Sequence, residues 1–442
     1  MATKTETTVT DVLPSGIDKI LVASNTGGKE ISLNSNAFLS LEYSESILHD
    51  TPQCLIQFVD TGSDALDGKT VIEGLPLVGQ EKVTLKFTDN LGTSLGDMDM
   101  FVNSVMPIGE DTRKSVVAID LVSKEFILNE KIRLRKRFDG RISDHIKQIL
   151  SANLADGLQS EKNLNIEETS NNYNFIGNNK KSYYTINWLC KKAVPNIEGA
   201  KGKTAGFLFF ETSEGFHFKS IDSLCQQKAK KRIFYNETSE LPEGYDIKAL
   251  SYTSDNDIEV QRKLAMGAYS NRLIMFDPFK CKYRIITPNA DQVEENLKLA
   301  GKNLPKLNPE FNVPGGDKEF SKTTYVLLDT GVLPSGNTNQ QLEKSDEENL
   351  VYADIYNQSI MRYNLFLSFS ATITIPADYS LHAGDAIHLD VPQRNTDKKK
   401  EGKNTFDGGL YIISDLTHLV TPRESLTRLK LVRESIGKKR KD

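Results

Sequence analysis

The chain has 442 residues and a mass of 49.4 kDa, a length that favours two to four domains over one. Its 55 lysines and arginines are outnumbered by 60 aspartates and glutamates. The resulting net charge of −5, with a pI near 5.9, disfavours the class of basic nucleic-acid-binding proteins. Hydrophobic residues make up 38% and charged residues 26%, which indicates a polar, well-solvated, multidomain globular protein.

The N-terminus and the cysteines narrow the class further. The first ten residues contain no apolar segment of the kind that a signal peptide needs. The longest apolar-leaning stretch, residues 363–376, is interrupted by polar residues, so we expect no membrane insertion. Four cysteines lie far apart without a CxxC spacing: Cys54, Cys190, Cys225 and Cys281. This pattern predicts reduced, buried thiols in a protein made in the cytoplasm.

Alternating apolar residues predict an antiparallel β-module in the first third of the chain. Residues 1–30 are rich in threonine, serine, glycine and aspartate and are expected to form an extended arm. Leu39, Leu41 and Tyr43 then alternate with polar residues, and residues 82–88 repeat the pattern. Further strands are predicted at 54–59, 101–106, 115–122 and 131–135. Together these segments make roughly one hundred residues of β-structure, enough for a small barrel or sandwich.

A helix is predicted next. Ile142, Ile146 and Ile149 recur at helical spacing, which predicts an amphipathic helix over 142–154. His145 falls on its polar face and is expected to be solvated or structural.

A second helix and a hairpin follow. The helix is predicted over 184–194 and is ended by Pro195. Trp188 lies off the apolar stripe of this helix and is expected at an interface or hydrophobic joint. The apolar segments 207–210 and 216–218, joined through a glycine turn, predict a β-hairpin.

The region from about 235 to 350 gives weaker patterns. Residues 261–269 are predicted to be helical, and 272–276 with 280–287 predict two strands. The loose stretch 288–336 is expected to form surface loops, and a helix is predicted from about 345 to 363.

The β-pattern returns near the C-terminus. Apolar residues alternate with polar ones at 372–375, 387–390 and 428–431, and residues 437–442 form a charged tail. Two β-modules of similar size therefore bracket the chain, and they are a possible distant duplication.

Motifs of catalysis are absent from the sequence. The six histidines have no metal-ligand spacing, and there is no phosphate-binding loop, dinucleotide fingerprint or nucleophile elbow. The acidic run at 97–100 lacks the glycine and final glutamate of a calcium loop. We therefore predict no catalytic, cofactor-binding or metal-binding residues, no cofactor and no enzymatic activity. A glycosidase carboxylate pair can be distant in sequence, so a cell-wall hydrolase remains the enzyme alternative.

Basic clusters are the other charged feature of the sequence. They lie at 131–137, 228–232, 397–400 and in the tail. In the first cluster, strand alternation would place Arg133 and Arg135 on a solvated face. No aromatic residues interleave with these cations in the manner of single-strand nucleic-acid binders, so solvated or subunit-contact surfaces are favoured.

Three ordered groups of motifs carry a resemblance to a known family. The first comprises FDGRISDHIKQIL at 138–150, NYNFI at 172–176 and YTINWLCKKA at 184–193. The second is MGAYSNRLIMFD at 266–277, and the third comprises ITIPADYSLHAGDAI at 373–387, GLYII at 409–413 and LTRLKLVR at 426–433. Their order resembles the central baseplate hub protein of contractile-tailed bacteriophages of the T-even type, from about residue 38 to 435. Residues before 30 and residues 288–340 depart from the family's pattern.

The resemblance implies an α+β, β-rich fold with two tube-type antiparallel β-barrel domains and inserted mixed and irregular domains. The expected domains are an arm at 1–30, a first tube domain at 31–137, a mixed helix-and-hairpin domain at 138–234, a second tube domain at 235–260 plus 360–435, an inserted domain at 261–359 and a basic tail at 436–442.

The resemblance also implies the protein's role in the virion, after synthesis in the host cytoplasm. A homotrimer would form a pseudo-sixfold ring that adapts the hexameric tail tube to the trimeric central spike and encloses a channel for DNA. The implied partners are the tail tube protein or a tube-initiator ring, the central spike, baseplate wedge proteins and the tape-measure protein. DNA would pass without specific binding, which suits a mildly acidic protein.

The loops 60–68 and 89–98 are rich in aspartate and poor in lysine, and they are candidates for the lumen or rim. Besides the hydrolase, the competing interpretation is a carbohydrate- or receptor-binding tail component, which would need exposed aromatic residues in a groove.

Overall fold

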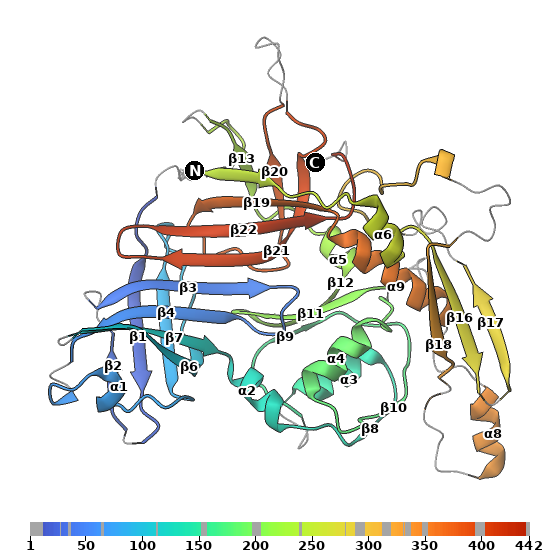
Figure 1. The fold of residues 1–442 in the computed structure, drawn as a ribbon, viewed down its shortest axis with the longest axis horizontal. Coiled ribbons are helices and arrows are strands. Elements are labelled where there is room, and N and C mark those ends of the chain that lie inside the picture. The colour runs from blue at the N-terminus through green and yellow to red at the C-terminus, as the bar shows by residue number, and fades with distance from the viewer. Residues whose placement is uncertain are drawn as a thin grey trace, which may run out of the picture.

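The computed structural model describes residues 12–26, 28–33, 37–62, 66–111, 114–151, 157–196, 205–237, 241–278, 280–287, 297–311, 320–329, 331, 337–346, 352–393 and 403–438. Its largest element is a curled sheet of 14 strands (Figure 1). No helix within these ranges is long and apolar enough to cross a membrane.

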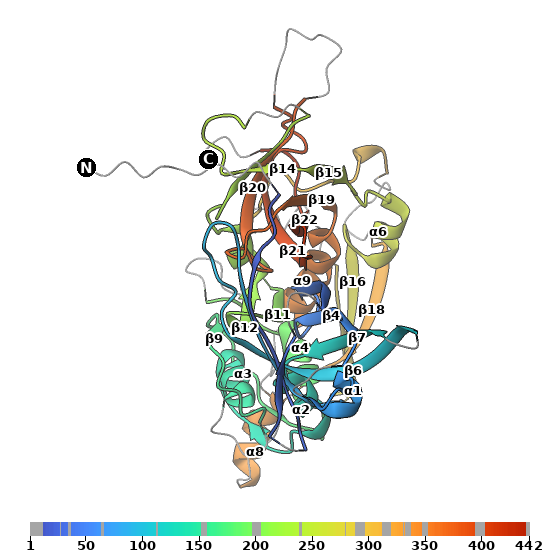
Figure 2. The ribbon, with the colours of Figure 1, turned by 90° about the vertical axis from the view of Figure 1, so that its left-hand side faces the viewer.

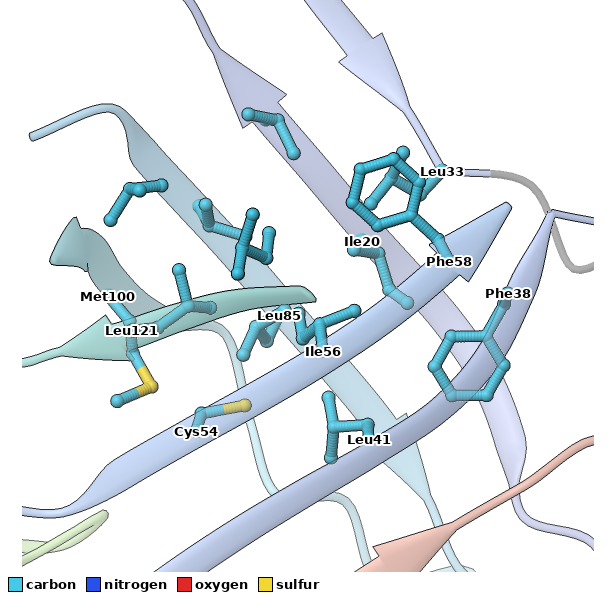
Figure 3. Close-up of a cluster of buried hydrophobic side chains, with 14 of the residues drawn as sticks. Ile20, Leu33, Phe38, Leu41, Cys54, Ile56, Phe58, Leu85, Met100 and Leu121 are labelled. Atoms are coloured by element: carbon cyan, nitrogen blue, oxygen red, sulfur yellow. The ribbon is translucent and has the colours of Figure 1, made fainter. Parts of the chain in front are cut away.

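Seven strands and the short helix α1 (Val71–Gly74) form the first β-module. The strands are β1 (Gly16–Ala23), β2 (Glu30–Ser32), β3 (Phe38–Ser46), β4 (Gln53–Asp60), β5 (Lys82–Thr88), β6 (Met98–Glu110) and β7 (Ser115–Val122). Their order across the sheet is β2-β1-β5-β6-β7-β4-β3. Val83, Leu85 and Phe87 of β5 are each at most 1% exposed, which confirms the period of two predicted there. All three belong to one buried cluster. In this cluster Leu85 lies among side chains of the facing strands, such as Ile56 (Figure 3).

The second β-module repeats this strand order. Its strands are β13 (Arg232–Tyr235), β14 (Ile247–Ala249), β15 (Ser251–Ser254), β19 (Phe369–Pro376), β20 (Ala386–Asp390), β21 (Gly409–Val420) and β22 (Ser425–Arg433). Across the sheet they run β14-β13-β20-β21-β22-β19-β15. Numbered within each module, both orders read 2-1-5-6-7-4-3. The modules differ in β13, which is parallel to both its neighbours, whereas β1 is antiparallel to both of its own.

The two modules share one sheet but not one core. β3 pairs antiparallel with β21 through six residue pairs, from Leu41↔Val420 to Ser46↔Asp415. The apolar side chains on either side of this seam belong mainly to separate buried clusters. The fold is therefore β-rich, with two modules of equal strand order fused edge to edge.

A mixed helix-and-hairpin part lies beside the seam. It contains α2 (Lys124–Lys131), β8 (Arg137–Phe138), α3 (Ile142–Leu150), β9 (Leu164–Ile166), β10 (Phe175–Ile176), α4 (Ser182–Cys190), β11 (Phe207–Thr212), β12 (Gly215–Ser220) and α5 (Ile221–Cys225). The predicted hairpin is confirmed, because β11 pairs antiparallel with β12 and carries phenylalanines that stack across the pair. Trp188 packs edge-on against Tyr173 and Phe175, so it forms a joint inside this part.

The segment between the two halves of the second module adds a small sheet and helices. Its elements are α6 (Val260–Met266), β16 (Asn271–Asp277), β17 (Lys282–Ile286), η3 (Pro309–Phe311), β18 (Lys322–Leu327), α8 (Thr338–Asp346) and α9 (Tyr352–Phe366). The sheet order is β17-β16-β18. Leu273 and Met275 on its inner face join the core of the helix-and-hairpin part. The two strands predicted near 272–287 are therefore confirmed.

The predicted arm at 1–30 is wrong where the structure describes it. Residues 16–23 form β1, which pairs along its length with β5, because Ile20 and Val22 alternate into the core. Residues 1–11 lie outside the described part of the chain.

The exposure of Leu39 also departs from the prediction. A register shift between Phe38 and Ser40 buries Phe38 and leaves Leu39 39% exposed.

The strand predicted at 131–135 is also wrong. Ser123 caps α2 by accepting the N–H of Phe126 at 3.3 Å, and that helix runs to Lys131. Residues 132–136 contain no strand, and Leu134 is the buried residue among them. The basic cluster thus follows a helix, so Arg133 and Arg135 do not occupy a strand face.

His145 is not on a polar face. It is fully buried in α3, its Nε2 lies 2.8 Å from the backbone oxygen of Tyr173, and its ring sits edge-on to Phe138 and Phe175. His145 lies three residues after Ile142 and four before Ile149, so it adjoins the isoleucine stripe, and the segment that carries Tyr173 and Phe175 packs against it. α3 ends at Leu150, and residues 152–156 of the predicted helix lie outside the described chain.

Two differences concern residues 288–363. The stretch expected to be loose contains β18, which pairs parallel to β16. The helix α8 lies mostly between this stretch and the helix predicted from about 345 to 363, which is confirmed from residue 352 on as α9, while residues 347–351 lie outside the described chain. Among the cysteines, all four thiols are unpaired, but Cys281 is exposed where burial was predicted.

Candidate functional site

Eight antiparallel strands form one continuous wall across both modules. In spatial order they are β6-β7-β4-β3-β21-β22-β19-β15, four from each module. One face of this wall packs on the two cores, and the other face is turned away from them. We take this outward face and the two ends of the wall as the candidate functional site.

The ends of the wall are open strand edges. β15 pairs with β19 and with no other described strand. In β6, residues 98–101 pair with β5, whereas residues 104–110 pair with β7 alone. Figure 2 shows the β6–β7 hairpin reaching away from the body of the molecule. Met106 and Ile108 in this stretch are 45% and 57% exposed, unusual for apolar residues of an isolated strand.

In the second module, the strand edge equivalent to the open edge of β6 is paired with another strand of the chain. β21 corresponds to β6 in strand order: its residues 409–412 pair with β20, and its residues 415–420 pair with β3. Both strands carry a register shift at the same point, between Ile413 and Asp415 in β21 and between Val102 and Ser104 in β6. β3 corresponds in turn to β15. The open edges of β6 and β15 are therefore equivalents of the two edges that pair at the seam inside the chain.

The outward face of the wall is polar and carries few charges. Around β3, β4, β6, β7 and β21 it forms a groove of about 330 Å³ lined by Glu42, Ser44, Gln53, Leu55, Ser104, Met106, Asp120 and Thr417. Its charged residues are carboxylates and no lysine lines it. The second module contributes Arg428 and Lys430, and the latter lies 3.9 Å from Asp415. The face is thus acidic on one module and nearly balanced on the other.

The two loops expected at a lumen or rim begin with buried aspartates instead. Asp60 is 2% exposed and accepts the N–H of Val71 at 2.7 Å. Asp89 is 5% exposed and accepts the N–H groups of Thr93 and Tyr379. Asp60 thus holds its own loop, and Asp89 holds its loop and joins it to the second module.

A buried ion cluster locks the helix-and-hairpin part onto the seam. Glu45, near the end of β3, is 1% exposed and accepts hydrogen bonds from Tyr43 Oη at 2.9 Å, Ser213 N at 2.8 Å and Ala383 N at 3.1 Å. His382 Nδ1 lies 3.4 Å from Glu45 Oε2. Ser213 belongs to the β11–β12 turn and His382 to the second module. One carboxylate therefore ties three parts of the chain together.

The protonation of this cluster is set by the pair of charges. Burial alone would raise the pKa of Glu45, but the hydrogen bond and charge of His382 lower it to about 2. Burial likewise acts to lower the pKa of His382, and the bond and charge of Glu45 outweigh it and raise that pKa above its ordinary value. Both groups are therefore charged at mildly acidic pH.

His382 makes the stability of the cluster depend on pH. A raised histidine pKa contributes stability in full below the unfolded value near 6.5 and loses it as the pH rises through the folded value. We therefore expect His382→Gln to lower the free energy of unfolding more at about pH 6 than at about pH 8.5. Urea unfolding of both proteins at the two pH values measures this difference, and an equal loss at both would contradict the assignment.

The carboxylates of Glu125 and Glu211 lie close together, and Glu211 lines a groove of about 340 Å³. Lys162 Nζ lies 2.8 Å from Glu125 Oε2 and also contacts Glu211, and Ser123 Oγ donates to Glu211 at 2.9 Å. Burial raises the pKa of Glu211 to about 7. A glycosidase needs its sugar between the two carboxyl groups, and here the ammonium of Lys162 occupies that space. The arrangement is an ion cluster that ties β11 to α2.

The basic clusters form ion pairs within the described chain. Lys230 lies 2.9 Å from Asp385, and Lys438 of the tail lies 3.3 Å from Asp390. Residues 397–400 and 439–442 lie outside the described part. Among the described residues, no three histidines, cysteines or carboxylates are grouped so that they could hold a metal ion.

The fold is one shared with tail proteins of known structure. The 43 kDa tail protein of prophage MuSo2 from Shewanella oneidensis superposes with a TM-score of 0.50 at 9% sequence identity, over 94% of this chain and 98% of that one. The tail protein from Neisseria meningitidis MC58 gives a TM-score of 0.51 at 9% identity, over 95% and 98% of the two chains. No family model and no curated protein matches the sequence. The similarity thus spans nearly the whole architecture and rests on structure alone.

Proposed function

We propose that the chain is a baseplate hub and tube-initiation protein of a contractile phage tail, and that it acts as a homotrimer. The observation that carries the proposal is the repeated strand order with one edge contact made and one left open. β3 of the first module pairs with β21 of the second, whereas the equivalent edges, one edge of β15 and residues 104–110 of β6, have no strand beside them within the described chain. In the proposed trimer, β15 of each copy pairs with β6 of the next.

Such pairing closes a ring by the same contact repeated six times, three times within chains and three times between them. Three copies of an eight-stranded wall enclose one barrel, because closure removes every open edge. The six modules then match a hexameric tail tube or tube-initiator ring. The helix-and-hairpin part covers the seam within each chain but not the seam between chains, so the ring also has threefold features for a trimeric spike.

In this proposal the first tube domain comprises about residues 16–122 and the second about 232–254 plus 369–433, the bounds of the strands of the two modules. The helix-and-hairpin part and the inserted sheet lie outside the ring. The outer face of β16–β18 carries Phe276, Tyr283, Ile285, Tyr325 and Leu327, which are 41–76% exposed. An apolar face of this kind supports contacts with wedge or spike proteins. The tape-measure protein and DNA occupy the channel, and the protein resides in the virion.

The outward wall face would line the channel, and its charge predicts how DNA behaves there. Glu42→Lys with Asp120→Lys changes the charge of this face by four per subunit. We expect the variant trimer to bind double-stranded DNA at least about tenfold more tightly in 50 mM than in 200 mM salt, whereas the natural trimer binds weakly in both. Titration of labelled DNA measures the affinities.

A matched variant, Asp67→Lys with Glu73→Lys, makes the same charge change at exposed positions around α1, outside the wall. If it binds DNA as tightly as the wall variant, the wall face is not the DNA-facing surface.

The two competing functions are less well supported. A cell-wall hydrolase needs an accessible carboxylate pair, and Glu125 with Glu211 is occupied by Lys162. A carbohydrate-binding component needs exposed aromatic residues in a groove. The aromatic residues that line the groove beside β11 are not exposed (Phe207, Phe209, Tyr356 and Tyr363), and the exposed Tyr283 and Tyr325 lie on an open sheet face. Turnover of purified cell wall by the chain alone would contradict the non-enzymatic proposal.

A further inference from the structure

A groove of about 440 Å³ lies between the start of β11, the helices α4 and α9, and the loop after β3. Its volume is within the range of sites that hold ligands, roughly 300–1,000 Å³. Phe207, Leu208 and Phe209 of β11 line it, and Leu48 and Lys191 are exposed at its margin. The groove therefore runs along one edge of a strand.

That edge of β11 is unpaired. β11 is the first strand of the sheet β11-β12-β9, so β12 covers its other edge only. Ile221 donates its N–H to Gly206, which places the even-numbered residues of β11 in hydrogen-bonded pairs with β12. The N–H and C=O groups of Phe207, Phe209 and Glu211 consequently point away from β12.

The outward N–H and C=O groups of Phe207 are hydrogen-bonded by a side chain in place of a neighbouring strand. The hydroxyl of Tyr363, on α9, accepts the N–H of Phe207 at 2.9 Å and donates to its carbonyl oxygen. One side chain thus replaces both hydrogen bonds of a neighbouring strand. Phe209, the next residue with the same orientation, is 3% exposed, and its outward N–H and C=O meet no hydrogen-bonding group of the described chain. Buried backbone groups of this kind are almost always paired in a completed structure.

The charged residues around the groove indicate the charge of the segment that would bind there. Lys191 and Lys322 line it, and the one carboxylate that does so is Asp50. Burial raises the pKa of Asp50, and Asn187 donates to it at 2.7 Å. The groove is therefore positive and complements a carboxylate on its occupant.

We propose that this groove binds an extended, carboxylate-bearing segment of a different protein, which adds to β11 by pairing its backbone with Phe209. The occupant is a different protein because α4, α9 and β11 carry neither of the open wall edges, β6 and β15, through which copies of this chain meet. The assignment of the occupant to a different protein rests on the proposed function. The unpaired backbone of Phe209 and the positive charge of the groove are independent of that function.

The test uses the full chain with the photocrosslinking residue benzoylphenylalanine in place of Leu48, produced together with the other proteins of the same tail. We expect mass spectrometry to identify one crosslinked segment of another protein, containing an aspartate or glutamate. In the complex, hydrogen exchange in peptides covering 207–211 should slow at least about tenfold, as a newly formed backbone pair requires. Lys191→Glu should reduce the crosslink several-fold, whereas Lys228→Glu, exposed outside the groove, should leave it unchanged.

Three results would overturn the inference: no crosslink in assembled tails, a crosslink to a second copy of this chain, or unchanged exchange at 207–211 in the complex. The mass of the chain alone, measured in parallel, reports on the trimer. A trimer whose Phe209 edge stays unprotected in tails contradicts this inference and leaves the proposed function intact.

Discussion

Ser254→Pro is expected to convert the trimer into folded monomers. Asp255 donates its N–H to Ser370 at 2.9 Å, so the antiparallel pattern turns the N–H and C=O of Ser254 away from β19 and toward the open edge. Proline removes that N–H and places its ring where the next strand would lie. Because all three contacts between chains are affected, we expect the concentration needed to form the trimer to rise at least about 100-fold. Sedimentation velocity over a dilution series measures it.

Ser254→Ala is the matched control, since it removes the same exposed hydroxyl but keeps the N–H. It should remain trimeric, and the circular dichroism of both variants should equal that of the natural protein. A proline variant that stays trimeric at the same concentrations would show that β15 does not form the contact.

Glu45→Gln is expected to lower the free energy of unfolding by about 3 kcal/mol or more, the effect of breaking a buried ion pair. The glutamine amide keeps one acceptor oxygen, but its NH₂ group meets donors from Tyr43, Ser213 or Ala383. It also leaves His382 buried without its counter-charge. Urea unfolding followed by the fluorescence of Trp188, the one tryptophan, reports the loss in the part that the cluster holds.

Glu42→Gln provides the comparison on the same strand. Glu42 is exposed on the opposite face of β3 and should change the free energy of unfolding by less than about 0.5 kcal/mol. Equal effects at the two positions would mean that the cluster around Glu45 does not hold the hairpin to the seam.

Regular alternation made several strands predictable from the sequence. The predicted boundaries of β7 are those observed, and the apolar residues of β5 and the phenylalanines of the β11–β12 hairpin are buried as expected. Alternation fixes which side chains face a core, and it needs no knowledge of distant segments. The similar size of the two modules also suggested a duplication, and their identical strand order now agrees with it.

Features set by distant contacts were not predictable in this way. His145 is buried because the segment carrying Tyr173 covers a helix face that looked polar. β1 was taken for an arm because its short apolar run gains its meaning from β5, some 65 residues later. Glu45 and His382 are separated by most of the chain, and neither has a neighbour in sequence that reveals the cluster.

The candidate site likewise depends on contacts between segments that are distant in the sequence. The open edges of β6 and β15 became visible only when the seam between β3 and β21 showed which edges pair. A strand edge has no signature in composition, because its hydrogen-bonding groups belong to the backbone.

The most direct test of the ring is the solution mass of the full chain. The account predicts a single closed species of about 148 kDa, three times 49.4 kDa, with no larger oligomers as the concentration rises, because closure leaves no free edge. A 49.4 kDa monomer at all concentrations, or an open-ended series of oligomers, would contradict it.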